Sequence, residues 1–158
     1  MILNCNEIIP DRLWVGRYVG PDDVKYLSQL GITAIMSLQS DEDLAFYGIS
    51  MKRMVRACRE AQIDLHRIAT SDFDPVALAR NLPQCVAGLE AALTPRWARV
   101  YLHCTAGINR GPTTAAAYLI RSRGWSAREA HDYLTARRSC SPYLTVLEQY
   151  EAALKPRA

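Results

Sequence analysis

Hydrophobic positions along this chain alternate between strand-like runs and helix-like spacing. Four short apolar runs, rich in β-branched residues, predict strands at residues 13–18, 32–38, 63–69 and 99–103. Apolar residues three and four positions apart predict helices between these strands and along the C-terminal third. The predicted helices cover residues 22–30, 50–62, 76–93, 111–123, 127–138 and 144–154. Residues 41–48 form a loop or a short helical turn, and both alternatives stay open.

Strands that alternate with helices predict a central, mostly parallel sheet flanked by helices, which is an α/β fold. The chain has 158 residues, of which 49% are hydrophobic. This size suits one domain with a single core, and we expect that domain to span residues 1–158. Open α/β sheets bind ligands at the carboxyl ends of their strands. The end of the strand at 99–103 is therefore the expected site.

The segment after that strand has the composition of an anion-binding loop. Cys104 follows the strand, and Arg110 stands six positions later, where an alanine-rich helix begins. The N–H groups of such a loop can form a concave nest, and the helix directs its positive end toward the sulfur. A planar guanidinium suits two phosphoryl oxygens. These groups favour the thiolate, the reactive form of cysteine. Cys104 is thus a candidate nucleophile, and a packed cysteine in a turn is the alternative.

The residues between Cys104 and Arg110 are candidate phosphate contacts through their backbone. Gly107 would allow a ligand to approach the chain closely, and Asn109 is expected at a positive φ. Together with the preceding histidine, the candidate substrate-binding residues of this segment are His103, Thr105, Ala106, Gly107, Ile108 and Asn109.

These residues resemble the His-Cys-x5-Arg motif of cysteine-dependent phosphatases, and in particular the dual-specificity branch. The resemblance implies the protein tyrosine phosphatase-like fold and a phosphocysteine intermediate on Cys104. It assigns phosphoryl binding to Arg110, and His103 would favour the thiolate from outside the pocket. Many members carry a hydroxyl residue after the arginine that assists breakdown of the intermediate. Gly111 stands there instead, which leaves slower breakdown open without implying inactivity.

The leaving group of a phosphate ester needs a proton from a general acid. In the family this acid is an aspartate about thirty residues before the cysteine, and Asp72 lies 32 positions before Cys104. Asp72 matches the first aspartate of the family's Asp-Phe-Asp sequence and is the preferred candidate. Asp74 is the alternative, but its place before Pro75 gives it a role as a helix cap.

Resemblance to the plant glucan phosphatases extends over residues 43–48, 72–74, 103–107 and 138–142. In those enzymes aromatic residues stack on sugar rings, and Phe46, Tyr47 and Phe73 match such positions. The resemblance implies a phosphorylated glucan or a phosphoprotein as substrate, with other phosphate esters such as phosphoinositides as further alternatives. A pseudophosphatase that binds phosphate without catalysis is the alternative from another functional class.

Composition excludes several other classes. The formal net charge of +3 suits anionic substrates, and the arginines at 53, 56, 59, 137 and 138 are expected on solvated helix faces, not in a nucleic-acid site. No apolar run reaches the roughly eighteen residues of a membrane span. Five cysteines without a secretory signal favour a reducing, cytoplasmic location. The chemistry requires no cofactor or metal, and the sequence carries no signal for an oligomeric state.

Overall fold

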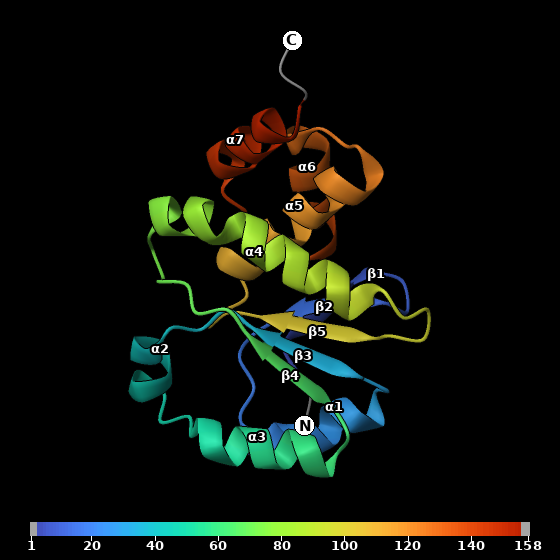
Figure 1. Cartoon of the computed structure of the whole chain (residues 1–158), viewed down its shortest axis with the longest axis vertical. Coiled ribbons are helices and arrows are strands. Elements are labelled where there is room, and N and C mark those ends of the chain that lie inside the picture. The colour runs from blue at the N-terminus through green and yellow to red at the C-terminus, as the bar shows by residue number, and fades with distance from the viewer. Residues whose placement is uncertain (1–2, 156–158) are drawn as a thin grey trace.

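The computed structural model describes residues 3–155, which contain a five-stranded sheet in the order β1-β2-β5-β3-β4 (Figure 1). The central strands pair in parallel, and only the edge strand β1 is antiparallel to its neighbour β2. The predicted mostly parallel sheet is therefore confirmed. The strands are β1 (Cys5–Ile9), β2 (Leu13–Gly16), β3 (Ala34–Ser37), β4 (Asp64–Arg67) and β5 (Val100–His103).

Helices cover both faces of this sheet (Figure 1). One face carries the short 3-10 helix η1 (Pro21–Asp23), α1 (Val24–Gln29) and α3 (Met51–Glu60). The other face carries α4 (Pro75–Leu93), α5 (Arg110–Arg123), α6 (Ala127–Arg137) and α7 (Leu144–Leu154). Helix α2 (Asp41–Phe46) lies beyond the carboxyl ends of the parallel strands, at the edge where α/β sheets bind ligands.

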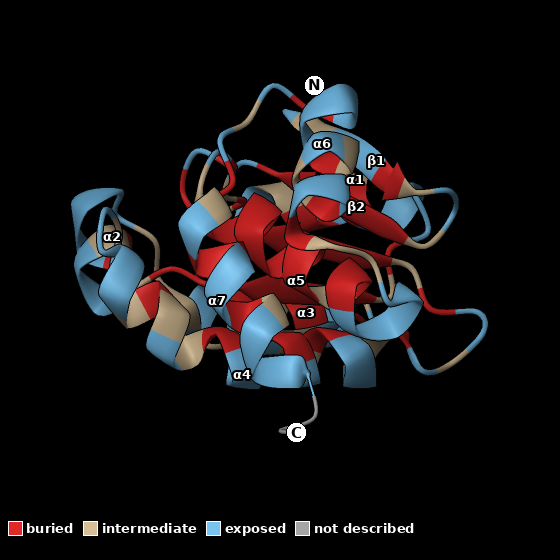
Figure 2. Cartoon of the chain, turned by 90° about the horizontal axis from the view of Figure 1, so that it is seen from above, coloured by how far each residue is buried: buried red, intermediate tan, exposed pale blue. Residues whose placement is uncertain are grey.

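Strand residues alternate between two hydrophobic clusters because successive side chains of a strand point to opposite faces. Ile35 and Tyr101 pack toward α1 and α3, whereas Met36 and Leu102 pack toward α4 to α7. Figure 2 shows this burial at the centre of the molecule, with the outer surfaces of the surrounding helices exposed. Both sides of the central strands are covered, which explains why their sequences are apolar throughout.

Helix α5 is buried along most of its length although it carries few large side chains. Ala115, Ala116 and Ala117 are fully buried between the sheet and the other helices. Small side chains allow this helix to lie close to β2 and β5, which it contacts directly. The start of α5 is thereby fixed at the carboxyl end of β5.

The predicted strands and helices are confirmed, with boundaries that differ by at most two residues. The segment at 41–48 is a helix, started by a capping box in which Ser40 and Asp43 bind each other's backbone N–H groups. Strand β1 was not predicted, because only Ile8 of its five residues is buried and the apolar alternation is weak. Within residues 3–155, none of the helices combines the length and apolar character that crossing a bilayer demands.

Candidate active site

Residues 104–109, here called the Cys104 loop, connect β5 to α5 at the carboxyl edge of the sheet. Neighbouring segments hold this loop through its backbone. Tyr18 N–H donates to the carbonyl of Thr105 at 2.9 Å, and Ser141 N–H donates to the carbonyl of Ile108 at 2.9 Å. The loop is therefore fixed from both of its ends.

The positive φ in this loop belongs to Gly107 at 71°, while Asn109 has a φ of −112°. The expectation for Asn109 is therefore wrong. A Cβ atom on Gly107 would lie 2.6 Å from backbone atoms of Gly16 and 2.6 Å from Arg138 Nη2. The glycine thus permits close packing of the loop on β2 in addition to the left-handed backbone.

Cys104 lies at the base of the loop with only 2% of its surface exposed. Its Sγ accepts a hydrogen bond from Gly111 N–H at 3.4 Å, in the first turn of α5. The unpaired N–H groups at a helix N-terminus carry partial positive charge. The sulfur of Cys104 therefore lies at the N-terminal end of α5.

Arg110 extends from the first position of α5 and is 1% exposed. Its Nη1 donates to Asp43 Oδ2 at 2.6 Å and to the carbonyl of Thr70 at 2.8 Å. Its Nη2 lies 3.2 Å from Asp72 Oδ2 and 3.3 Å from Thr105 Oγ1. Within residues 3–155 no atom accepts a hydrogen bond from the buried Nε. One edge of the guanidinium is thus anchored, and Nε keeps a donor for an anion.

Asp43 is a site residue that the sequence pattern does not predict. Its side chain is 13% exposed. Burial alone would raise the pKa of this carboxyl, but hydrogen bonds from Arg110 and from Ser40 N–H outweigh burial and lower the pKa. The Ser40-x-x-Asp43 spacing marks a helix start, and nothing in the sequence indicates that the same carboxylate reaches Arg110.

Asp72 and Asp74 lie in different surroundings. Asp74 Oδ1 accepts a hydrogen bond from Ala77 N–H at 2.9 Å and caps α4. Asp72 directs Oδ2 toward Arg110, while its Oδ1 accepts from Phe73 N–H at 3.0 Å. The side chain of Asp72 is 25% exposed, so it is accessible to solvent and to a ligand. Asp72, the preferred candidate for the general acid, is therefore the aspartate that faces Arg110 and the Cys104 loop.

His103 is buried, and its Nδ1 lies 2.9 Å from the carbonyl oxygen of Cys104. Burial lowers the pKa of His103 to about 4, although the hydrogen bond to Cys104 opposes this effect. The imidazole is therefore neutral near pH 7, and Nδ1–H donates to the carbonyl. His103 supports the backbone of Cys104 and lies behind it, away from the exposed rim of the site.

Aromatic side chains gather beside the site on exposed positions. Phe46 is 82% exposed and Tyr47 is 41% exposed, and their ring centroids are 4.9 Å apart. Tyr18 extends this row, with its ring centroid 4.8 Å from that of Tyr47. Phe73 is 81% exposed and has a φ of 53°, in the left-handed region. Tyr18 was not predicted, because it lies in a connecting segment far from the loop in sequence.

The segment before α7 approaches the same site. Burial raises the pKa of Tyr143; the charges of Asp72 and Cys104 raise it further, and Arg110 opposes them. Tyr143 is therefore within electrostatic reach of the predicted catalytic groups. The backbone N–H of Tyr143 donates to Thr113 Oγ1 at 2.9 Å. The Thr113 hydroxyl therefore accepts a hydrogen bond that holds the segment before α7.

Arg138 contradicts the expectation of a solvated helix face. It is 6% exposed and lies under the Cys104 loop. Its Nε donates to the carbonyl of Gly107 at 2.7 Å, and its Nη2 donates to the carbonyl of Ala106 at 3.1 Å. The expectation fails because Arg138 follows α6 with an extended backbone, which turns its side chain inward.

Comparison with known proteins matches residues 13–152 to the dual-specificity phosphatase catalytic domain. This match covers most of the chain and includes every predicted catalytic residue. The chain belongs to the dual-specificity phosphatase family. Members of this family are cysteine-based phosphatases, which agrees with the resemblance in the sequence. No cluster of three or more His, Cys, Asp or Glu side chains suited to a metal ion occurs between residues 3 and 155.

Among its relatives, an amyloplastic phosphoglucan phosphatase of Castanea sativa is 32% identical over 152 residues, which is 95% of this chain and 40% of that protein. Laforin of Mus musculus is 26% identical and aligns with 86% of this chain and 44% of its own length. The chain thus spans less than half of these curated relatives.

Solved structures share the fold over nearly the whole chain. The active form of the phosphatase Tk-PTP has a TM-score of 0.80 at 20% identity, covering 98% of this chain and all (100%) of that chain. The human tyrosine phosphatase-like serine/threonine/tyrosine-interacting protein has a TM-score of 0.77 at 24% identity, covering 96% and 98%. These likenesses confirm the predicted phosphatase fold.

Proposed function

We propose that this chain hydrolyses phosphate monoesters through a phosphocysteine intermediate on Cys104. The observation that carries the proposal is the buried guanidinium of Arg110 beside the Cys104 loop. Asp43 anchors it, and its Nε has no hydrogen-bond acceptor within residues 3–155. Asp72 lies against the same guanidinium. A nucleophile, an anion-binding cation and an acid thus converge on one loop.

The reaction then has two steps. In the first, the Cys104 thiolate attacks phosphorus, the bond to the leaving oxygen breaks, and protonated Asp72 gives its proton to that oxygen. In the second, water attacks the phosphocysteine, the sulfur–phosphorus bond breaks, and Asp72 takes the proton from the water. Arg110 and the loop N–H groups stabilise the charge on the phosphoryl oxygens throughout.

The test of the nucleophile is hydrolysis of para-nitrophenyl phosphate without added metal. Cys104→Ser should abolish turnover, and retained turnover in that variant would refute the proposal. A single-turnover measurement of nitrophenol release separates a slow enzyme from a pseudophosphatase, since a binding module would release none.

Asp72 and Asp74 provide a matched pair for the acid. Asp72→Asn should slow an alkyl phosphate more than an aryl phosphate, because a good leaving group needs less protonation. Asp74→Asn is the control, since asparagine caps a helix about as well as aspartate. Equal losses for both substrates in Asp72→Asn would assign the proton transfer to another group.

We propose phosphorylated glucan as the substrate class. The row formed by Tyr18, Tyr47 and Phe46 supports this assignment. Tyr47 and Phe46 are exposed and Tyr18 is half-buried, and aromatic rings at the edge of a phosphate site provide flat apolar surfaces for sugar faces. The phosphoglucan phosphatase of Castanea sativa, aligned over 95% of this chain, supports it as well.

Phosphoprotein is the second candidate substrate. A dual specificity protein phosphatase of Homo sapiens is 27% identical over 154 residues, aligned with 95% of this chain and 36% of its own length. The site also admits such a substrate chemically, since Arg110 and the Cys104 loop recognise the phosphoryl group and not the group that carries it.

The deciding experiment compares phosphate release from solubilised amylopectin with release from phosphopeptides. We expect Phe46→Ala and Tyr47→Ala to reduce glucan turnover several-fold and to leave para-nitrophenyl phosphate turnover nearly unchanged. Trp97→Ala is the matched control, because Trp97 is 69% exposed but precedes β5, at the opposite edge of the sheet. Release from phosphopeptides alone would assign the protein substrate.

A further inference from the structure

Among the described residues 3–155, the hydrogen-bond partners of the buried Arg138 guanidinium are all neutral oxygens. Besides the carbonyls of Ala106 and Gly107, it donates from Nη1 to Asn6 Oδ1 at 2.9 Å and from Nη2 to Asn4 Oδ1 at 3.1 Å. Across residues 3–155, no carboxylate lies within ion-pair distance of this guanidinium. A buried charge without a counter-charge is unfavourable, so a nearby anion would stabilise it.

Arg110 differs from Arg138 in this respect. Two carboxylates, those of Asp43 and Asp72, lie within 3.2 Å of its guanidinium nitrogens. The Asp43 carboxylate alone offsets the single positive charge of Arg110, even while Asp72 carries the proton that it donates in catalysis. Arg138 is therefore a second cation beside the Cys104 loop, and no carboxylate of residues 3–155 offsets its charge.

The peptide groups of the loop connect Arg138 to the site. All peptide bonds of the described chain are trans, so each N–H points opposite to the carbonyl of its own peptide. The carbonyls of Ala106 and Gly107 point to Arg138, and the N–H groups of Gly107 and Ile108 therefore point away from it. A cation at the carbonyl end polarises these peptides and strengthens their N–H groups as donors.

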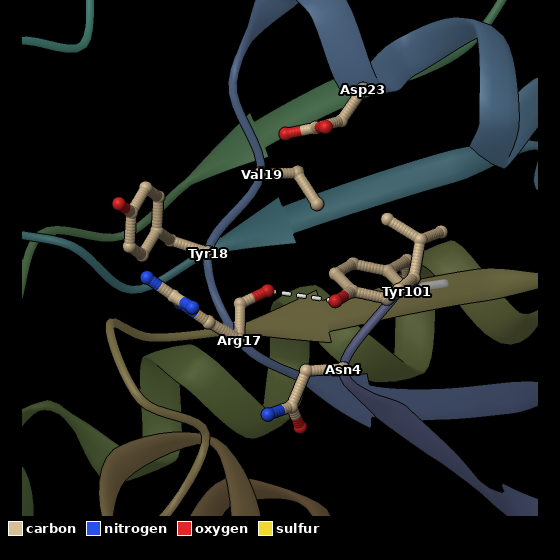
Figure 3. Close-up of a pocket in the computed structure, with 7 residues that line it drawn as sticks. Asn4, Arg17, Tyr18, Val19, Asp23 and Tyr101 are labelled. Carbon is tan, nitrogen blue, oxygen red and sulfur yellow. Dashed lines mark hydrogen bonds between the residues drawn. The ribbon is translucent and has the colours of Figure 1, made fainter. Parts of the chain in front are cut away.

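Asparagines 4 and 6 hold the outer side of the guanidinium. Asn6 lies on the edge strand β1, and Asn4 precedes that strand at the border of a cavity of about 220 Å³ (Figure 3). The same cavity is lined by Arg17 and Tyr101, whose hydroxyl donates to the carbonyl of Arg17. The N-terminal segment thus supplies acceptors that orient Arg138 without neutralising it.

We propose that Arg138 is a positioning residue that strengthens phosphate binding through the peptides of the Cys104 loop, and that Asn4 and Asn6 preserve its uncompensated charge. The proposal deepens the proposed function, since it concerns the same anion site. It does not depend on the identity of the group that carries the phosphate.

Asn6→Asp is the decisive variant. It keeps the shape and the acceptor of Asn6 but places a carboxylate on Arg138. If Arg138 served only to hold the loop in place, this charge-assisted bond would hold it equally well or better. Phosphate affinity would then be at or above the wild-type value. The electrostatic role predicts weaker binding of inorganic phosphate, by about three- to tenfold, with an unchanged or higher melting temperature.

Arg138→Met removes the charge, and we expect it to weaken phosphate binding by about tenfold or more. Arg138→Lys should recover part of that loss, because it restores the charge without the planar fork. Arg137→Met is the matched control: Arg137 is the preceding residue, it is exposed, and its guanidinium lies 3.3 Å from the ring centroid of Tyr133. Its removal changes the net charge equally and should change affinity less than about twofold.

Affinity is measured by titration calorimetry with inorganic phosphate, and the pH midpoint of iodoacetamide inactivation provides a second readout. That midpoint should move upward in Arg138→Met and Asn6→Asp. The charged or titratable groups that face the sulfur, namely Asp43, Asp72, His103, Arg110 and Tyr143, remain unchanged in these variants. Phosphate affinity in Asn6→Asp equal to that of Arg137→Met would overturn the proposal, even if Arg138→Met failed to fold. Phosphate binding without turnover in the wild type would instead refute the proposed function.

Discussion

Asp43 of α2 and Arg110 of α5 are 67 positions apart in sequence and form a nearly buried ion pair, with Nη1 2.6 Å from Oδ2. The pair ties the start of α5 to α2. It holds one edge of the guanidinium and leaves Nε without a protein partner within residues 3–155. The orientation of Arg110 therefore depends on a carboxylate that does not touch the substrate phosphate in the proposed mechanism.

We expect Asp43→Ala to lower kcat for para-nitrophenyl phosphate by about tenfold, because a hydrogen bond between charged groups is worth about 1.5–3 kcal/mol. Removal of the negative charge acts in the opposite direction on anion affinity, so the affinity for phosphate should fall less than kcat. Asp41→Ala is the control, since Asp41 is 92% exposed and pairs with Arg67. Equal kcat values for the two variants would show that the anchor is dispensable.

Gly111 offers a test of intermediate breakdown. A Cβ atom at this position would lie 3.6 Å from Cys104 Sγ and 3.5 Å from Val15 Cγ1, which is ordinary contact. Gly111→Ser therefore fits and brings a hydroxyl near a phosphoryl group on the sulfur. We expect faster breakdown of the phosphocysteine by about two- to tenfold, the worth of one neutral hydrogen bond. Burst kinetics measure this step, and Gly111→Ala should not reproduce the effect.

Gly107 and Gly124 separate two consequences of replacing a left-handed glycine. Both have a positive φ. In the part of the chain that the structure describes, no atom lies within 4 Å of a Cβ atom at Gly124, whereas a Cβ atom at Gly107 meets the backbone of Gly16. Gly124→Ala should cost about 1 kcal/mol of unfolding free energy from backbone strain alone. Gly107→Ala should cost more and also abolish most activity, as urea unfolding and turnover would reveal. Similar costs at both sites would contradict the role of close packing.

Stability should depend on pH through His103. Its pKa is about 4 in the folded chain, below the ordinary value of about 6.5. The unfolded chain binds a proton first as the pH falls, so stability is present above pH 6.5 and is lost toward pH 4. At pH 5 the loss is about 2 kcal/mol. Urea unfolding at pH 7.5 and 5 should show this loss diminished in His103→Gln but retained in His66→Gln, where the replaced side chain is exposed.

Local patterns predicted the parts of the molecule that local physics determines. The central strands are apolar because both of their faces are buried, and the loop between Cys104 and Arg110 follows directly from its strand and helix. Long-range contacts were not predictable in this way. The sequence around Asp43 indicates only a helix start, and the pair Arg137-Arg138 predicts two surface arginines. Only the folded chain brings Asp43 and Arg138 to the Cys104 loop.

Strand β1 and the φ of Asn109 illustrate two other limits. The strand exposes most of its side chains, so its pairing with β2 leaves little trace in the hydrophobic pattern. Asparagine tolerates a positive φ, but the positive φ of this loop lies at Gly107, where the loop packs closely on β2. In both cases the deciding neighbour is distant in sequence.

The alanines of α5 have a consequence for how this domain can vary. Ala115, Ala116 and Ala117 are fully buried in the middle of α5, and the same helix begins with the arginine of the site. A larger side chain in the interior would push the helix outward and carry its first turn with it. Repacking far from the substrate would therefore alter the reaction geometry, and substitutions inside this helix would affect the chemistry as well as the folding.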